Sequence, residues 1–157
     1  DRIKVAPEAY PTVTVPRRLD ASLGGEIRLL GYDMGGPTDV VAGDSLDVTL
    51  FWRAEARPAE DYSVFLHLAA ESGPPHAQDD DQPQDGVYPT SFWDVGEVVT
   101  ETRRIQIPRD LGPGEYPLVA GLYVLETGRR LPRLGPGGTV QGDSVFLETV
   151  TVRAGDS

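Results

Sequence analysis

Apolar and polar residues alternate along several stretches of this chain, a pattern typical of β-strands that bury one face. The clearest case is residues 111–125, LGPGEYPLVAGLYVL, where a Gly-Pro-Gly turn precedes the alternation. One face would carry Tyr116, Leu118, Ala120, Leu122 and Val124, and the other Val119, Gly121 and Tyr123. We predict that this stretch is a central strand of a β-sandwich.

Two aromatic residues in such stretches are predicted to be structural. Tyr116 directly follows the turn, as expected for a tyrosine corner whose hydroxyl bonds back to the connecting backbone. Trp52 continues the apolar alternation of Leu46, Val48 and Leu50 and is therefore expected in the core.

Further strands are expected at residues 26–34, 46–53, 62–69, 98–107 and 145–152. About seven strands and no helical repeat predict an all-β fold, an immunoglobulin-like or fibronectin-like antiparallel β-sandwich, with a jelly roll as the alternative. Residues 24–153 would form one domain with a long loop at 70–96. Residues 1–23 would be a proline-rich linker with an edge strand at TVTV, and residues 154–157 a tail.

The composition excludes several classes of function. A formal charge of -11 over 157 residues disfavours binding to nucleic acid or attraction to an anionic membrane surface. No cysteine is present, so thiol metal and redox sites are excluded. No stretch is apolar enough for a membrane span, so we expect no direct membrane insertion by these residues.

The long loop contains three aromatic residues, Tyr88, Phe92 and Trp93, which would be costly to leave in water. These loop residues could pack on an aromatic strip on the second face of the central sheet. If the strands that carry its residues are neighbours, the strip would consist of Phe51, Phe65, His67, Val119 and Tyr123. Either the loop covers this strip, or part of it stays exposed as a sugar-stacking or protein-docking surface. The candidate ligand-binding residues are His67, Tyr88, Trp93 and Asp94.

The same loop carries carboxylates that suggest calcium. Asp79, Asp81 and Asp85 are the candidate ligands, because calcium prefers several oxygen donors on a flexible loop. The EF-hand spacing fails, since Thr90 stands where a bidentate Glu is needed. A solvated acidic loop is the alternative, and we expect no cofactor.

Catalytic motifs are weak. Residues 43–46 spell GDSL, as in serine esterases, but a strand follows and neither His67 nor His76 has an Asp three positions earlier. The GDS triplet recurs at residues 142–144 and 155–157 in turn-like contexts, which makes it a turn signature. We therefore expect that the chain itself is not an enzyme.

An ordered series of motifs resembles a known family. It runs from IRLLGYD (27–33) through LDVTLFWRA (46–54) and DYSVFLHL (61–68) to YPTSFWDVGEVV (88–99) and IPRDLGPGEYPLVAGLYVLETGRRLP (107–132). This series resembles the extracytoplasmic C-terminal β-sandwich domain of bacterial membrane glycosyltransferases of the mannosyltransferase or aminoarabinose-transferase type.

The resemblance implies a non-catalytic accessory or interaction domain outside the cytoplasm, tethered to the membrane through upstream segments absent here. Its partners would be a glycan or the membrane-embedded part of the parent protein. The resemblance carries no catalytic residue onto this chain. The alternative is a carbohydrate-binding module that uses the loop aromatics.

Overall fold

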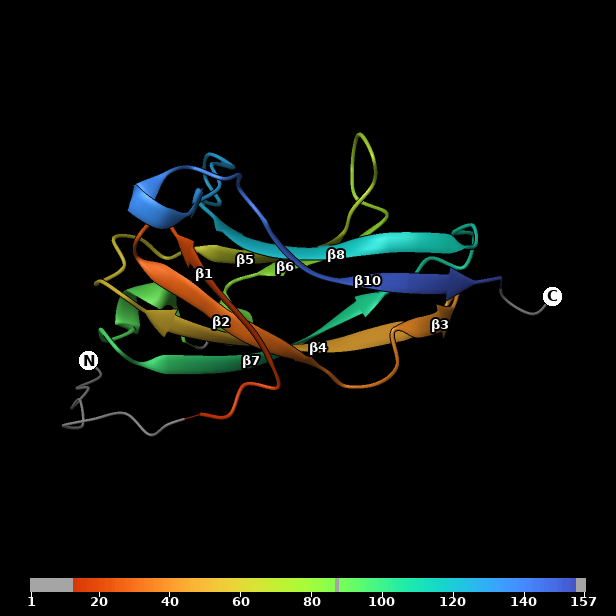
Figure 1. Ribbon diagram of the computed structural model, residues 1–157, viewed down its shortest axis with the longest axis horizontal. Coiled ribbons are helices and arrows are strands. Elements are labelled where there is room, and N and C mark those ends of the chain that lie inside the picture. The colour runs from red at the N-terminus through yellow and green to blue at the C-terminus, as the bar shows by residue number, and fades with distance from the viewer. Residues whose placement is uncertain (1–12, 87, 155–157) are drawn as a thin grey trace.

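The computed structural model describes residues 13–86 and 88–154, except for the side chain of Asp85. Two five-stranded sheets lie face to face and enclose the core (Figure 1). Sheet A has the order β7-β4-β2-β1-β9 and contains β1 (Arg17–Leu23), β2 (Ile27–Met34), β4 (Ser45–Ala54), β7 (Val98–Gln106) and β9 (Arg133–Leu134). Sheet B has the order β3-β10-β8-β5-β6 and contains β3 (Asp39–Val41), β5 (Ser63–Leu68), β6 (Ala77–Asp81), β8 (Gly114–Tyr123) and β10 (Val145–Arg153).

The predicted β-sandwich is thereby confirmed. Neighbouring strands pair antiparallel, apart from the parallel pair of β3 and β10. Three short 3-10 helices lie in connections: η1 (Pro83–Gly86), η2 (Thr90–Phe92) and η3 (Pro136–Gly138).

Side-chain alternation fills the core as predicted. The inward positions of β4, including Trp52, are buried, and so are Leu118, Ala120 and Leu122 of β8. Val64, Leu66 and Leu68 of the neighbouring strand β5 lie beside these β8 residues in register and are buried as well. This burial of apolar area between the sheets is the main term that stabilises the fold.

The predicted linker contains a strand of sheet A. β1 pairs with β2 along residues 17–23, and Leu23 at its end is fully buried. The position predicted for the edge strand, TVTV, is wrong, because the strand starts at Arg17. Val15, the last residue of TVTV, packs on Leu30 and Phe51 on the outer side of sheet A. The remainder of the predicted linker, residues 1–12, and most of the predicted tail lie outside the described residues.

The tyrosine corner is present. The Tyr116 hydroxyl donates to the carbonyl of Gly112 over 2.6 Å, which fixes the turn before β8 to the strand itself. The His76 ring meets the Tyr116 ring edge to face, with centroids 5.0 Å apart. Tyr116 therefore has the structural role that its position predicted.

The long loop has more regular structure than its composition indicated. Residues 77–81, AQDDD, form β6, which pairs with β5 as an edge strand. The η1 and η2 helices follow before β7 begins. An edge strand pairs through its backbone and needs few apolar side chains, so this polar segment carried no strand signal.

A buried ion pair closes the side of the sandwich between β6 and β7. Glu101 and Arg103 are neighbours on the inner face of β7, and Arg103 Nε donates to Glu101 over 3.0 Å. The indole N–H of Trp52 donates to the same carboxylate over 2.8 Å. Arg103 also donates to the carbonyls of Asp81 and Gln82, each over 2.9 Å, which ties the end of β6 to β7.

Candidate functional site

The outer side of sheet B carries a row of aromatic residues. Strand register places Phe146 of β10 beside Val119 of β8, and Val119 beside His67 of β5. Phe65 and Tyr123 lie further along the same side, with ring centroids 6.3 Å apart. We call these five residues the aromatic face.

Four of the five residues predicted for this strip are thus brought together, and one is not. Phe51 belongs to β4 of sheet A, where it packs on the outer side with Val15 and Leu30. The alternation of β4 gives the outward direction of Phe51 correctly but does not say which sheet the strand joins.

Phe65 is the buried centre of the aromatic face. The Phe65 ring lies against the backbone at Gly121. The guanidinium carbon of Arg130 lies 4.1 Å from the centroid of this ring, which makes a cation–π contact. Arg130 is held there by an ion pair with Asp143 at 3.3 Å. The connection between β8 and β10 therefore covers Phe65, and the expected cover by aromatic residues of the long loop is wrong.

His67 lies beside Phe65 in a fixed orientation. Its Nε2 is 3.0 Å from Asp80 Oδ1 on β6, and its ring centroid is 4.9 Å from that of Phe65. Burial lowers the pKa of His67, and the opposing effect of the Asp80 carboxylate does not restore it. The imidazole is therefore neutral at neutral pH, and because a carboxylate only accepts, Nε2 carries the proton and Nδ1 keeps a lone pair.

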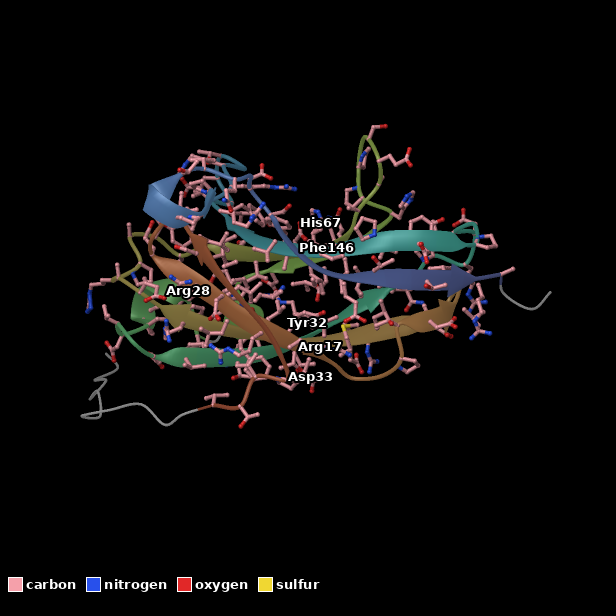
Figure 2. The ribbon with its side chains drawn as sticks, in the orientation of Figure 1. Arg17, Arg28, Tyr32, Asp33, His67 and Phe146 are labelled. Atoms are coloured by element: carbon pink, nitrogen blue, oxygen red, sulfur yellow. The ribbon has the colours of Figure 1, made fainter. Side chains whose placement is uncertain are left out.

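Phe146 is the exposed member of the face. The residue is 54% exposed and lies near the start of β10, where β10 pairs with β8 but β3 does not reach. Figure 2 labels Phe146 and His67 on the same side of the molecule. In Figure 1, residues 69–76 and the connection between β8 and β10 rise from this side of sheet B to the right and left of its centre. The exposed Phe146 ring and the residues beside it in register form the candidate binding surface.

Sequence analysis did not single out Phe146, although a signal was present. Val145 and Leu147 flank it and are buried, so alternation alone places the Phe146 ring on the outer side. A large aromatic residue at an outward position of a strand is the feature that identifies this site.

The aromatic residues of the long loop are not on this face. Trp93 is fully buried in the core between the sheets, and its indole N–H donates to the Tyr88 carbonyl over 3.1 Å. The expectation that Trp93 stacks on a ligand is therefore wrong. Tyr88 is half-buried against the core and its hydroxyl bonds Glu97 at 2.6 Å, while the Asp94 backbone N–H donates to the same carboxylate.

Of the three predicted calcium ligands, the structure places the side chains of Asp79 and Asp81, whereas the side chain of Asp85 lies outside the described residues. Asp79 and Asp81 are on β6, paired with Leu66 and Val64, so they project to the opposite side from Asp80. The premise of a flexible acidic loop is wrong here, because these residues belong to a strand. Within residues 13–86 and 88–154, no group of three or more potential ligands that could hold a metal is found.

Among the residues described, no helix has the length and apolarity to cross a membrane.

Comparisons with known proteins add a likeness of fold. No family model matches the chain, and neither does any curated protein. Among solved structures, the crystal structure of the C-terminal domain of Wzt is similar, with a TM-score of 0.47 and 12% sequence identity over 92% of this chain and 83% of that chain. So few residues are identical that no site residue is transferred from it.

Proposed function

We propose that this β-sandwich is a non-catalytic binding domain whose aromatic face binds a glycan. The observation that carries this proposal is the exposed ring of Phe146, in register with Val119 and His67 across three strands. Sugar rings present apolar C–H faces, which stack on aromatic rings, and this contact removes the Phe146 ring from water.

Polar groups beside the ring supply the hydrogen bonds that such a ligand needs. His67 is held by Asp80 and offers Nδ1 as an acceptor. Arg130, which lies over the Phe65 ring, forms an exposed ion pair with Asp143, and the two side chains offer a donor and an acceptor. A few fixed polar groups beside an apolar contact are typical of sites that recognise small ligands. Of the ligand-binding residues predicted from the sequence, the proposed site retains His67. Its stacking residue is Phe146 and not Trp93.

The broader context stays a prediction from the resemblance. In that prediction the domain is an extracytoplasmic accessory part of a membrane glycosyltransferase, partnered by a glycan or by the membrane-embedded part of its parent. The full open reading frame tests this, because membrane-spanning segments encoded upstream of Asp1 are expected. An upstream region that encodes a different class of protein would contradict it.

A glycan array tests the binding function directly. The wild-type chain is expected to bind a defined subset of glycans, and Phe146→Ala is expected to lose most of that signal. Phe92→Ala is the matched control, because Phe92 is also an exposed phenylalanine, 44% exposed, but belongs to η2 rather than to sheet B.

The proposal fails if the wild-type chain binds no glycan at millimolar concentration, or if the two alanine variants lose binding equally. The first result would favour the accessory domain that contacts its parent protein. The second would mean that binding depends on general stability and not on the aromatic face.

A further inference from the structure

A cavity lies away from the aromatic face, where β1 and β9 meet the segment around η3. Its volume is about 590 Å³, within the range of roughly 300–1,000 Å³ found for small-molecule sites. Residues of β1 line one side, among them Asp20 and Ser22, and Arg133, Gly135 and Gln141 line the other. These groups are mostly polar, so the cavity suits a polar ligand.

Arg133 is held in this cavity wall by neutral acceptors. Its Nε donates to the Ser144 carbonyl over 2.9 Å, Nη1 to Gln141 Oε1 over 3.2 Å and Nη2 to the Gln141 carbonyl over 2.7 Å. A guanidinium has five N–H groups, so Nη1 and Nη2 each keep one donor. No carboxylate pairs with Arg133 among the residues described, so its charge is not neutralised.

Gly135 lets Gln141 reach this position. A Cβ built on Gly135 would lie 2.1 Å from Gln141 Nε2, so any side chain there would displace the amide. The contact of Gln141 with Arg133 thus depends on a glycine in the wall.

A backbone irregularity holds a second arginine at the cavity. The register of β1 shifts between Arg18 and Ala21, and Asp20 has a positive φ of 56°. Its carbonyl accepts from Arg28 Nη1 over 2.9 Å, while its carboxylate is paired with Arg18 at 3.1 Å. Such a conformation is strained for a residue other than glycine, and strained residues cluster at functional positions.

The charge around Arg28 is positive. Arg28 and Arg53 share one carboxylate, that of Glu55, so this group carries an excess of one positive charge. The charged residues that line the cavity itself are Arg28, Arg133 and Asp20, so its wall has a net charge of +1 on a chain whose formal charge is -11. A local cationic cavity on an acidic protein favours an anionic ligand over a cationic one.

We propose that this cavity binds a sugar unit that carries an anionic group, either a carboxylate or a phosphate. Arginine is suited to both groups because its fork of donors matches their oxygen atoms. Ser22 and Gln141 would bond the sugar hydroxyls. The inference shares the ligand class of the proposed function but uses different strands, so either site can fail without the other.

Calorimetric titration of the full chain tests the cavity with four probes: a hexuronate, a hexose phosphate, the neutral hexose and inorganic phosphate. We expect the hexuronate or the hexose phosphate to bind with a Kd of about 1 mM, as is reasonable for a small ligand with few contacts. Gln141→Glu changes charge with almost no change in shape and places a carboxylate on Arg133. It should weaken binding about tenfold or more, equivalent to one neutralised charge.

Gln106→Glu is the control, since it adds the same charge on β7 and should leave the affinity within about twofold. Phe146→Ala should also leave it unchanged, which separates this cavity from the aromatic face. Binding of either the carboxylate or the phosphate sugar supports the proposal and names the anion. The proposal is overturned if no sugar anion saturates, if the neutral hexose binds equally, if only inorganic phosphate binds, or if Gln141→Glu has no effect.

Discussion

The ring of Phe65 lies so close to Gly121 that a Cβ built on this glycine would be 2.4 Å from two of its ring atoms. The two residues are opposite each other on β5 and β8. Because Gly121 has no side chain, the Phe65 ring packs directly on the backbone of β8. Arg130 packs over the Phe65 ring in a cation–π contact. The aromatic face therefore depends on a glycine in β8, the strand that the sequence predicted at the centre of the sheet.

Gly121→Ala should displace the Phe65 ring and destabilise the fold by about 1–3 kcal/mol, the usual cost of overpacking a filled site. Urea unfolding measures this change. Gly36→Ala is the control, because nothing lies within 4 Å of a Cβ at Gly36. Equal effects of the two substitutions would show that the Phe65 contact is unimportant.

Glu101→Gln should destabilise the protein far more than the equivalent change in the neighbouring pair. Glu101 and Arg103 have side chains only 2% and 4% exposed, so the variant leaves a buried guanidinium unpaired, at a cost of about 3–5 kcal/mol. In the Asp47–Arg104 pair the side chains are 43% and 71% exposed, so solvent screens the pair and Asp47→Asn should change stability little. Denaturant unfolding of both variants makes the comparison, and similar losses would contradict it.

Tyr116→Phe removes the hydroxyl that bonds the Gly112 carbonyl and should cost about 1 kcal/mol. For a chain of this size, that loss should lower Tm by about 2–4 °C. Differential scanning calorimetry measures the shift, and an unchanged Tm would mean that the corner bond does not stabilise the turn.

His67 should make stability depend on pH in the mildly acidic range. Burial lowers the pKa of His67 in the folded protein, so between that pKa and the unfolded value of about 6.5 the unfolded chain binds more protons. The free energy of unfolding should therefore be at its full value above that unfolded pKa and fall as the pH drops below it.

Urea unfolding at a series of pH values from neutral to acidic tests this slope. His67→Gln should reduce it, whereas His76→Gln, which alters the other histidine of the chain, should retain it. A slope that is the same in wild type and His67→Gln would assign the acid sensitivity to other groups.

The alternation of apolar residues predicted six of the ten strands in the described part of the chain, because each of these six buries one face in the core. β6 was missed because an edge strand pairs through its backbone and needs no apolar alternation. The side chains of its AQDDD sequence are polar, and one of them, Asp80, contacts His67. β3 and β9 are three and two residues long, too short to show any period.

The candidate site was predicted in part. The pattern placed Phe65, His67, Val119 and Tyr123 on one side of neighbouring strands, as found. It does not reveal which of two sheets a strand joins, so Phe51 was wrongly included. It also does not distinguish an aromatic residue that caps the core from one that faces solvent, which is why Trp93 was expected at the ligand site.

We propose that a glycan binds on the aromatic face, whose exposed member is Phe146. The most direct test is an NMR titration of the isotopically labelled chain with the glycan that gives the strongest array signal. We expect saturable shifts of the backbone amides of residues 65–67, 119–123 and 146, and we expect these shifts to disappear in Phe146→Ala. Shifts confined to other parts of the chain, or the same shifts in Phe146→Ala, would contradict it.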